Sequence, residues 1–122
     1  MYKHKGRSYN YRIEMTMDYL GGKWKALLIF YLYQKPFRFN ELKRYIPDIT
    51  QKMLTQQLRE MEGHGLINRH VYQQVPPKVE YTLTELGRSL FPIVDMMCHW
   101  AKENLEFDEI IEETSEQFNN KP

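Results

Sequence analysis

Residues 49–66, with the sequence ITQKMLTQQLREMEGHGL, decide the fold. At 100° per residue, Leu54, Leu58 and Met61 form one apolar stripe, which is typical of an amphipathic helix packed on a core. Thr50 precedes this pattern, and its hydroxyl can accept hydrogen bonds from the free amides of a first helical turn. Two glycines near the end of the stretch allow the chain to leave the helix and turn. The stretch therefore predicts a capped helix over about 50–62.

The opposite face of this helix carries cations, amides and a hydroxyl, but no acid. Its members are Gln51, Lys52, Thr55, Gln56 and Arg59. A hydrated helix face usually mixes both charges, whereas this set offers the donors that contact base edges and phosphates in DNA. A polar face that is merely hydrated is the alternative for one helix taken alone, so the neighbouring segments matter.

The segment before this helix completes a helix-turn-helix pattern. Residues 37–39 alternate apolar and polar, which predicts a very short strand, and Asn40 can cap a short helix over 41–45. A Pro-Asp pair at 47–48 ends that helix. In this layout the second helix enters the DNA major groove.

Two β-prone segments follow the second helix. Residues 66–73 and 78–83 are rich in Val, Ile, Tyr and Thr, and a Gln-Val-Pro-Pro linker between them suits a hairpin tip. A hairpin in this place is a wing. Its polar and cationic residues are Arg69, His70, Gln73, Gln74 and Lys78. Contact with a DNA backbone or minor groove is expected from them, and a hydrated hairpin without a ligand is the alternative.

The amino-terminal third predicts an arm and two helices. Residues 1–12 are basic and show no helical or alternating period, which predicts a mobile arm. A short helix is expected over 13–20, and residues 23–34 are apolar on nearly every side, which predicts the central core helix. Lys25, near the start of that helix, either contacts phosphate or is hydrated.

A long helix is predicted from 85 to about 105, capped by Thr84 and kinked at Pro92. This helix is apolar on two sides, and in a small chain the second side is covered most simply by another copy. We therefore expect a homodimer. The expected interface residues are Ile13, Met17, Leu90, Phe91, Val94, Met97, Cys98, Trp100 and Leu105. A purely intramolecular core, covered by the first helix, is the alternative.

Length and composition exclude several classes of protein. At 122 residues the chain suits one core. It has no apolar run of 18 residues and no secretion leader, so we expect no membrane span and a cytoplasmic location. The four histidines and Cys98 show no metal-ligand spacing, and no phosphate loop, nucleophile elbow or plausible Cys/His pair is present. The sequence therefore predicts neither an enzyme nor a metal or cofactor site.

The charges are distributed unevenly along the chain. Residues 1–80 hold 14 Lys and Arg against 7 Asp and Glu, a net charge of +7, whereas residues 81–122 hold 3 against 9, a net charge of −6. A basic amino-terminal part fits a polyanionic partner, and an acidic tail is expected to lie away from it. We expect an arm over 1–11, one domain over 12–106 and an acidic helix or tail over 107–122.

Three segments resemble the HxlR family of bacterial winged helix-turn-helix transcription regulators, in the same order. They are DYLGGKWKALLIFYL at 18–32, FRFNELKRYIPDITQKMLTQQLREMEGHGLI at 37–67 and VPPKVEYTLTELGRSLFPIVDMMCHWA at 75–101. The resemblance covers about 12–106. It implies a mainly α fold with a small β-hairpin, with helix 50–62 in the major groove, hairpin 66–83 as the wing, and the first and last helices forming the dimer.

The resemblance also bears on sensing. Redox- and aldehyde-sensing members of the family carry a cysteine just ahead of the first helix, and the corresponding position here is Tyr11. Thiol sensing through that position is therefore not implied for this chain. Cys98 does not match the sensing position, and the sequence assigns no small-molecule effector.

The leading hypothesis is a dimeric regulator that binds a pseudo-palindromic double-stranded DNA operator. Besides the polar face of helix 50–62, contacts to the DNA backbone are expected from Lys25, Arg38, Asn40, Lys43 and Lys78. The alternative is a winged-helix module that uses its basic face to bind an acidic protein.

Overall fold

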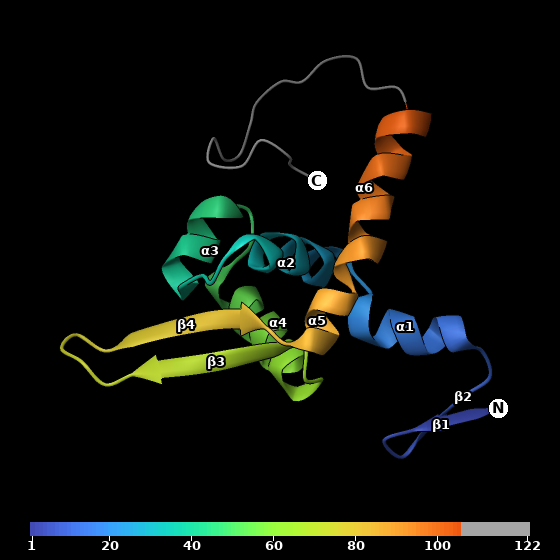
Figure 1. Ribbon diagram of the computed structural model, residues 1–122, viewed down its shortest axis with the longest axis horizontal. Coiled ribbons are helices and arrows are strands. Elements are labelled where there is room, and N and C mark those ends of the chain that lie inside the picture. The colour runs from blue at the N-terminus through green and yellow to red at the C-terminus, as the bar shows by residue number, and fades with distance from the viewer. Residues whose placement is uncertain (106–122) are drawn as a thin grey trace.

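Helices dominate the computed structural model, which describes residues 1–105 (Figure 1). The elements are β1 (Tyr2–His4), β2 (Arg7–Tyr9), α1 (Arg12–Leu20), α2 (Lys23–Gln34), α3 (Phe39–Tyr45), α4 (Gln51–Gly63), β3 (Ile67–Tyr72), β4 (Lys78–Leu83), α5 (Glu85–Ser89) and α6 (Phe91–Asn104). A mainly helical fold with a winged helix-turn-helix is confirmed. The tail predicted over 107–122 lies outside the described residues.

Helix α2 is the centre of the core, as its apolar circumference predicted. Leu28 and Ile29 are completely buried in it. Helix α4 contributes the buried stripe predicted from the sequence, and α6 contributes Val94. Because α2 is packed from several sides, it holds the helix-turn-helix and the carboxy-terminal helices in one body.

The turn between α3 and α4 is fixed by side-chain capping. Thr50 Oγ1 accepts a hydrogen bond from Met53 N at 3.0 Å, which confirms Thr50 as the N-cap of α4. The cap predicted for α3 was wrong, because that helix begins at Phe39 with Arg38 as its N-cap. Glu41 Oε1 accepts a hydrogen bond from Arg38 N at 2.9 Å, so a first-turn carboxylate takes the role assigned to Asn40.

The wing starts where α4 ends. Gly65 has φ +73°, a left-handed conformation that glycine adopts without a Cβ penalty, and Leu66 N donates to Met61 O at 2.9 Å. Strands β3 and β4 then pair antiparallel, as predicted. Phe37 forms a bridge with Tyr81 through two backbone hydrogen bonds of 3.1 and 2.8 Å, which ties the segment before α3 to the wing.

The amino-terminal residues form a hairpin, so the prediction of a mobile arm was wrong. β1 and β2 pair antiparallel, and the hairpin is tied to α1 by side chains. Asp18 accepts a hydrogen bond from Tyr9 Oη at 2.6 Å and pairs with the Arg7 guanidinium at 2.7 Å. Tyr9 is buried in consequence. Contacts with a helix nine or more residues away stabilise this hairpin, and such contacts leave no local period in the sequence.

The predicted single helix over 85–105 is two helices, α5 and α6, which meet at Leu90. Thr84 caps α5 as expected, with its Oγ1 accepting from Gly87 N at 3.1 Å. Pro92 lies in the first turn of α6, where a missing N–H breaks no intrahelical hydrogen bond. The expected kink is therefore a complete break.

Gly87 is a site where any side chain should destabilise the fold. A Cβ built there would lie 2.1 Å from Leu66 O and 3.0 Å from Leu83 Cδ2. Since Leu66 O also accepts the backbone hydrogen bond of Thr84 at 3.0 Å, it cannot retreat freely. We expect Gly87→Ala to lower the free energy of unfolding by about 1–3 kcal/mol, measured by urea denaturation.

Gly63 provides the matched control for that prediction, because a Cβ there would meet no atom within 4 Å. Gly63→Ala should leave stability unchanged or raise it by up to about 1 kcal/mol through helix propensity. Equal effects of the two substitutions would contradict the close approach of α5 to the Leu66 carbonyl.

Candidate nucleic-acid interface

The polar face of α4 is open to solvent, as predicted. Gln51, Lys52, Gln56 and Arg59 are exposed. Thr55 is half-buried, and its Oγ1 donates to Gln51 O at 2.9 Å. The core therefore takes the apolar stripe of the helix and leaves four long polar side chains on its solvent side.

This face is not free of acids, contrary to the prediction. Glu60 borders it, and Glu60 Oε1 accepts a hydrogen bond from Gln56 Nε2 at 3.3 Å. Glu60 Oε2 lies 2.8 Å from Lys25 Nζ. Hydrogen bonding from Lys25, followed by that from Gln56, lowers the pKa of Glu60. The negative charge is thus compensated from inside the protein.

Lys25 does not lie where a phosphate contact requires it. Only 9% of its surface is exposed, and its ammonium pairs with Glu60. Its position in a helix that is apolar all round could have indicated burial. Lys25 is therefore a structural residue that connects α2 to α4, and the prediction that it contacts the DNA backbone is not supported.

The other residues predicted to contact the DNA backbone differ in whether their side chains already have a partner in the protein. Arg38 and Asn40 are exposed at the start of α3. Lys43 is half-buried and donates from Nζ to the carbonyl of Ile49, so it closes the turn before α4. On the wing, Lys78 Nζ lies 3.4 Å from Glu80 Oε2, so a charge expected to be available for phosphate is partly neutralised.

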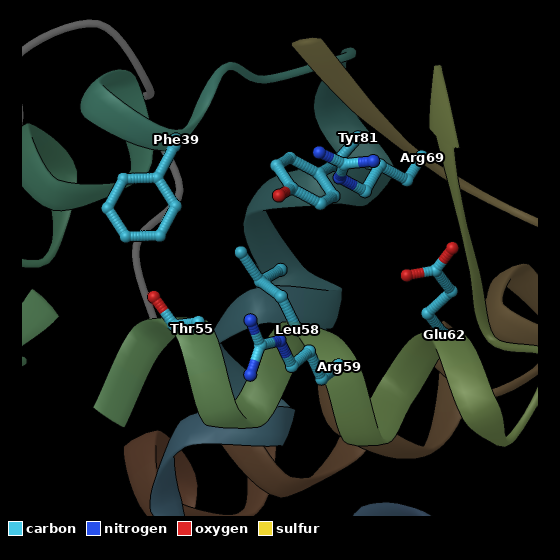
Figure 2. Close-up of a pocket in the computed structure, with 7 residues that line it drawn as sticks. All are labelled: Phe39, Thr55, Leu58, Arg59, Glu62, Arg69 and Tyr81. Carbon is cyan, nitrogen blue, oxygen red and sulfur yellow. The ribbon is translucent and has the colours of Figure 1, made fainter. Parts of the chain in front are cut away.

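A pocket of about 440 Å³ separates α4 from the wing (Figure 2). Its lining residues are Phe39, Thr55, Leu58, Arg59, Glu62, Arg69 and Tyr81. Phe39 and Glu62 were not singled out from the sequence. The lining residues come from α3, α4 and both strands of the wing.

Helix α6 has two apolar stripes with different environments. Val94 is 2% exposed and belongs to the protomer core, and Leu90 and Phe91 pack against the same core. Cys98 is also half-buried, and burial raises the pKa of its thiol. Val94, Leu90 and Phe91 therefore pack on the core of their own chain, and the expected role of these three and of Cys98 between subunits stays a prediction.

The second stripe of α6 is exposed. Its members are Ile93, Met96, Met97 and Trp100, spaced i, i+3, i+4 and i+7, with Leu105 beyond the helix. Ile13 and Met17 of α1 are exposed as well. Figure 1 shows α1 and α6 on the side of the molecule away from the wing tip. Five of the nine predicted interface residues are thus exposed, and the interface itself stays a prediction.

His64, at the carboxy-terminal end of α4, is the centre of a partly buried cluster. Its ring stacks on Tyr19 at 4.6 Å between centroids, and Tyr19 Oη lies 2.6 Å from His4 Nε2. His64 Nδ1 is buried and meets no hydrogen-bond partner within the described part of the chain. Burial, followed by the charge of Lys25, lowers the pKa of His64.

This cluster makes stability depend on pH. Because the folded protein holds the pKa of His64 below that of the unfolded chain, the unfolded chain binds the proton first as pH falls. The free energy of unfolding should therefore be undiminished above about pH 6.5 and decline as pH falls through that value. Urea denaturation across that range, with His64→Gln as the comparison, measures it. An equal decline in the His64→Gln variant would assign the effect to another group, and His99→Gln, an exposed histidine, serves as the control.

Residues 1–105 contain no group of three or more His, Cys, Asp or Glu side chains that could hold a metal ion. None of the helices in the same range combines the length and apolar character that crossing a bilayer requires.

Comparison with known proteins identifies the family. The model of the HxlR-like helix-turn-helix family matches residues 19–109. The uncharacterized HTH-type transcriptional regulator YtcD of Bacillus subtilis (strain 168) is 54% identical over 99 residues, which cover 81% of this chain and 79% of YtcD.

Solved structures agree with the sequence comparison. The redox regulator HypR in its oxidized form is 52% identical, with a TM-score of 0.75, and the match covers 79% of this chain and 99% of HypR. The reduced form of the transcriptional regulator YodB from B. subtilis is 39% identical, with a TM-score of 0.69, and covers 78% of this chain and 93% of YodB. These relatives are named as regulators, which confirms the expectation of a regulator rather than an enzyme. The chain belongs to the HxlR-like helix-turn-helix family.

Proposed function

We propose that the protein is a dimeric, sequence-specific DNA-binding transcription regulator that acts on DNA in the cytoplasm. The observation that carries the proposal is the exposed donor face of α4, directly flanked by the β3–β4 wing. A helix of this kind fits the major groove, while a wing beside it lies on the backbone or in the minor groove. The names of the relatives support the same function.

The proposed DNA contact of each side chain depends on its position in α3, α4 or the wing. Gln51 and Lys52 begin the helix, and residues at the start of a recognition helix approach base edges most closely. Gln56 and Arg59 lie one and two turns later on the same face. Arg38 and Asn40, exposed at the start of α3, are placed to contact the DNA backbone. Lys43 and Lys78 contribute less, since each already has a partner in the protein.

Dimerisation is proposed through the exposed stripe of α6 together with Ile13 and Met17 of α1. An apolar stripe of this length on a single chain is a common mark of a subunit interface. Two-fold symmetry would present two α4 helices to successive turns of one DNA face, about 34 Å apart. The operator is therefore expected to be a pseudo-palindrome.

The decisive experiment recovers the bound sequence and then removes one base contact. Genomic fragments that bind the purified protein yield the operator. Gln51→Ala should weaken operator binding by about 1–3 kcal/mol while it barely changes binding to a random duplex, as measured by fluorescence anisotropy. Equal losses on both duplexes would contradict base recognition by α4.

Salt dependence separates DNA binding from the alternative of an acidic protein partner. Each phosphate contact should contribute about −0.9 to the slope of log K against log salt. A steep slope is expected for the wild-type protein on duplex DNA. A shallow slope would favour the protein-binding module.

A further inference from the structure

Two arginines line the pocket between α4 and the wing, and they are the only cations among its lining residues within the described range 1–105. Arg59 comes from α4 and Arg69 from β3 (Figure 2). Neither guanidinium forms an ion pair or a hydrogen bond with another residue of the described range 1–105. Like charges on the walls of one pocket repel each other unless an anion lies between them.

The register of the wing explains why Arg69 faces this pocket. Arg69 pairs with Tyr81, and Ile67, two residues earlier on the same face, is buried. Side chains alternate between the faces of a strand, so Arg69 lies on the inner face, toward α4, whereas His70 lies on the outer face. Arg69 is exposed, so its guanidinium can be reached from solvent.

The remaining walls supply an apolar surface and one acid. Phe39, Leu58 and Tyr81 provide two rings and an aliphatic side chain. Glu62 is the one carboxylate among the lining residues that the structure describes, so these residues carry a net charge of +1. This combination suits a single oxyanion attached to a body with some apolar surface, because a guanidinium binds carboxylate and phosphate oxygens in a fork.

We propose that this pocket is an oxyanion site in which Arg59 and Arg69 hold one phosphate or carboxylate group between α4 and the wing. The inference deepens the proposed function, because one source of the anion is a backbone phosphate of the DNA strand that passes from α4 to the wing. The other source is a free small anion, which would compete with DNA for Arg59 and so act as an effector. Glu62 opposes either anion and keeps its binding weak.

The first arm of the test uses DNA. Arg69→Gln should weaken operator and random duplexes alike, by about 10- to 100-fold, and lower the salt slope by about 0.9. Operator duplexes with single neutral methylphosphonate linkages then locate the phosphate. At that position the wild-type protein should show the same loss as Arg69→Gln, and Arg69→Gln should lose nothing further.

The second arm uses inorganic phosphate and benzoate without DNA, at constant ionic strength. The amide NMR signals of residues that line the pocket should shift on titration, and Arg69→Gln should abolish the shifts. Glu62→Gln should strengthen binding by roughly two- to tenfold, because it removes the opposing charge. Arg88→Gln is the matched control, since Arg88 is exposed, lies 4.6 Å from the Tyr33 ring centroid and does not line the pocket.

The outcomes separate the two proposals. A single methylphosphonate position that cancels the effect of Arg69→Gln assigns the site to DNA, and saturable shifts with either free anion assign it to a small molecule. If duplex binding is intact and the Arg69→Gln variant behaves like the Arg88→Gln variant in both arms, the oxyanion site is overturned and the proposed function stands. If the free anions shift the NMR signals but duplex binding shows no steep salt dependence, the oxyanion site stands and the proposed function is overturned.

Discussion

Replacing Trp100 with aspartate is expected to convert the proposed dimer into a monomer at micromolar concentration. Trp100 is 58% exposed and lies on the outer stripe of α6, so in a dimer it is a candidate anchor of the interface. Truncating such an anchor typically costs about 2–4 kcal/mol, and burying an unpaired carboxylate adds to that loss. The dimer Kd should rise by about 30- to 1000-fold.

Sedimentation velocity measures this change directly. Because Trp100 does not belong to the buried core of the protomer, the far-UV circular dichroism of Trp100→Asp should match that of the wild type. Loss of the dimer should also lower the affinity for the operator, since two half-sites are no longer bound together. Val71→Asp places the same charge on an equally exposed apolar residue of the wing and should remain dimeric. An unchanged mass for Trp100→Asp would place the interface elsewhere.

Phe37→Ala is expected to cause the largest loss of stability, about 3–5 kcal/mol of the free energy of unfolding. Phe37 is completely buried, and its ring centroid lies 5.2 Å from that of Tyr45 and 6.2 Å from that of Tyr31. The alanine variant would leave a cavity where the start of the helix-turn-helix meets the wing. Small domains are stable by only about 5–15 kcal/mol, so the variant should unfold well below the wild-type temperature.

A graded series tests that explanation. Phe37→Leu keeps an apolar side chain and most of the volume, so its loss should be clearly smaller than that of Phe37→Ala. Urea denaturation followed by circular dichroism gives both values. The backbone bridge from Phe37 to Tyr81 does not involve the ring and should survive in both variants. Equal losses for leucine and alanine would show that the aromatic contacts, rather than the filled volume, carry the stability.

Patterns that depend on one helix alone could be predicted from the sequence. The apolar stripe of α4, its Thr50 cap and its exposed polar face follow from a 3.6-residue period and one hydroxyl. Apolar residues on nearly every side of α2 likewise predicted, from one helix alone, that it lies in the core. These features are local, so no knowledge of the neighbouring elements is needed to find them.

Helix α6 shows where a local pattern stops being sufficient. A helix that is apolar on two sides indicates two contact surfaces, but it does not say which one faces its own chain. In the structure α6 begins after Leu90, buries Val94 and leaves Trp100 exposed. The predicted interface therefore combined residues from both sides.

The sequence by itself determined the helix-turn-helix, the wing and the polar face of α4, because these depend on spacing along the chain. Tertiary structure decided the burial of Lys25 against Glu60, the packing of the amino-terminal hairpin on α1 and the meeting of Arg59 with Arg69 around one pocket. Each of these joins residues at least ten positions apart except for Tyr9 and Asp18, which are nine apart. The physical reason is that the charge and burial of a side chain depend on which distant element packs against it.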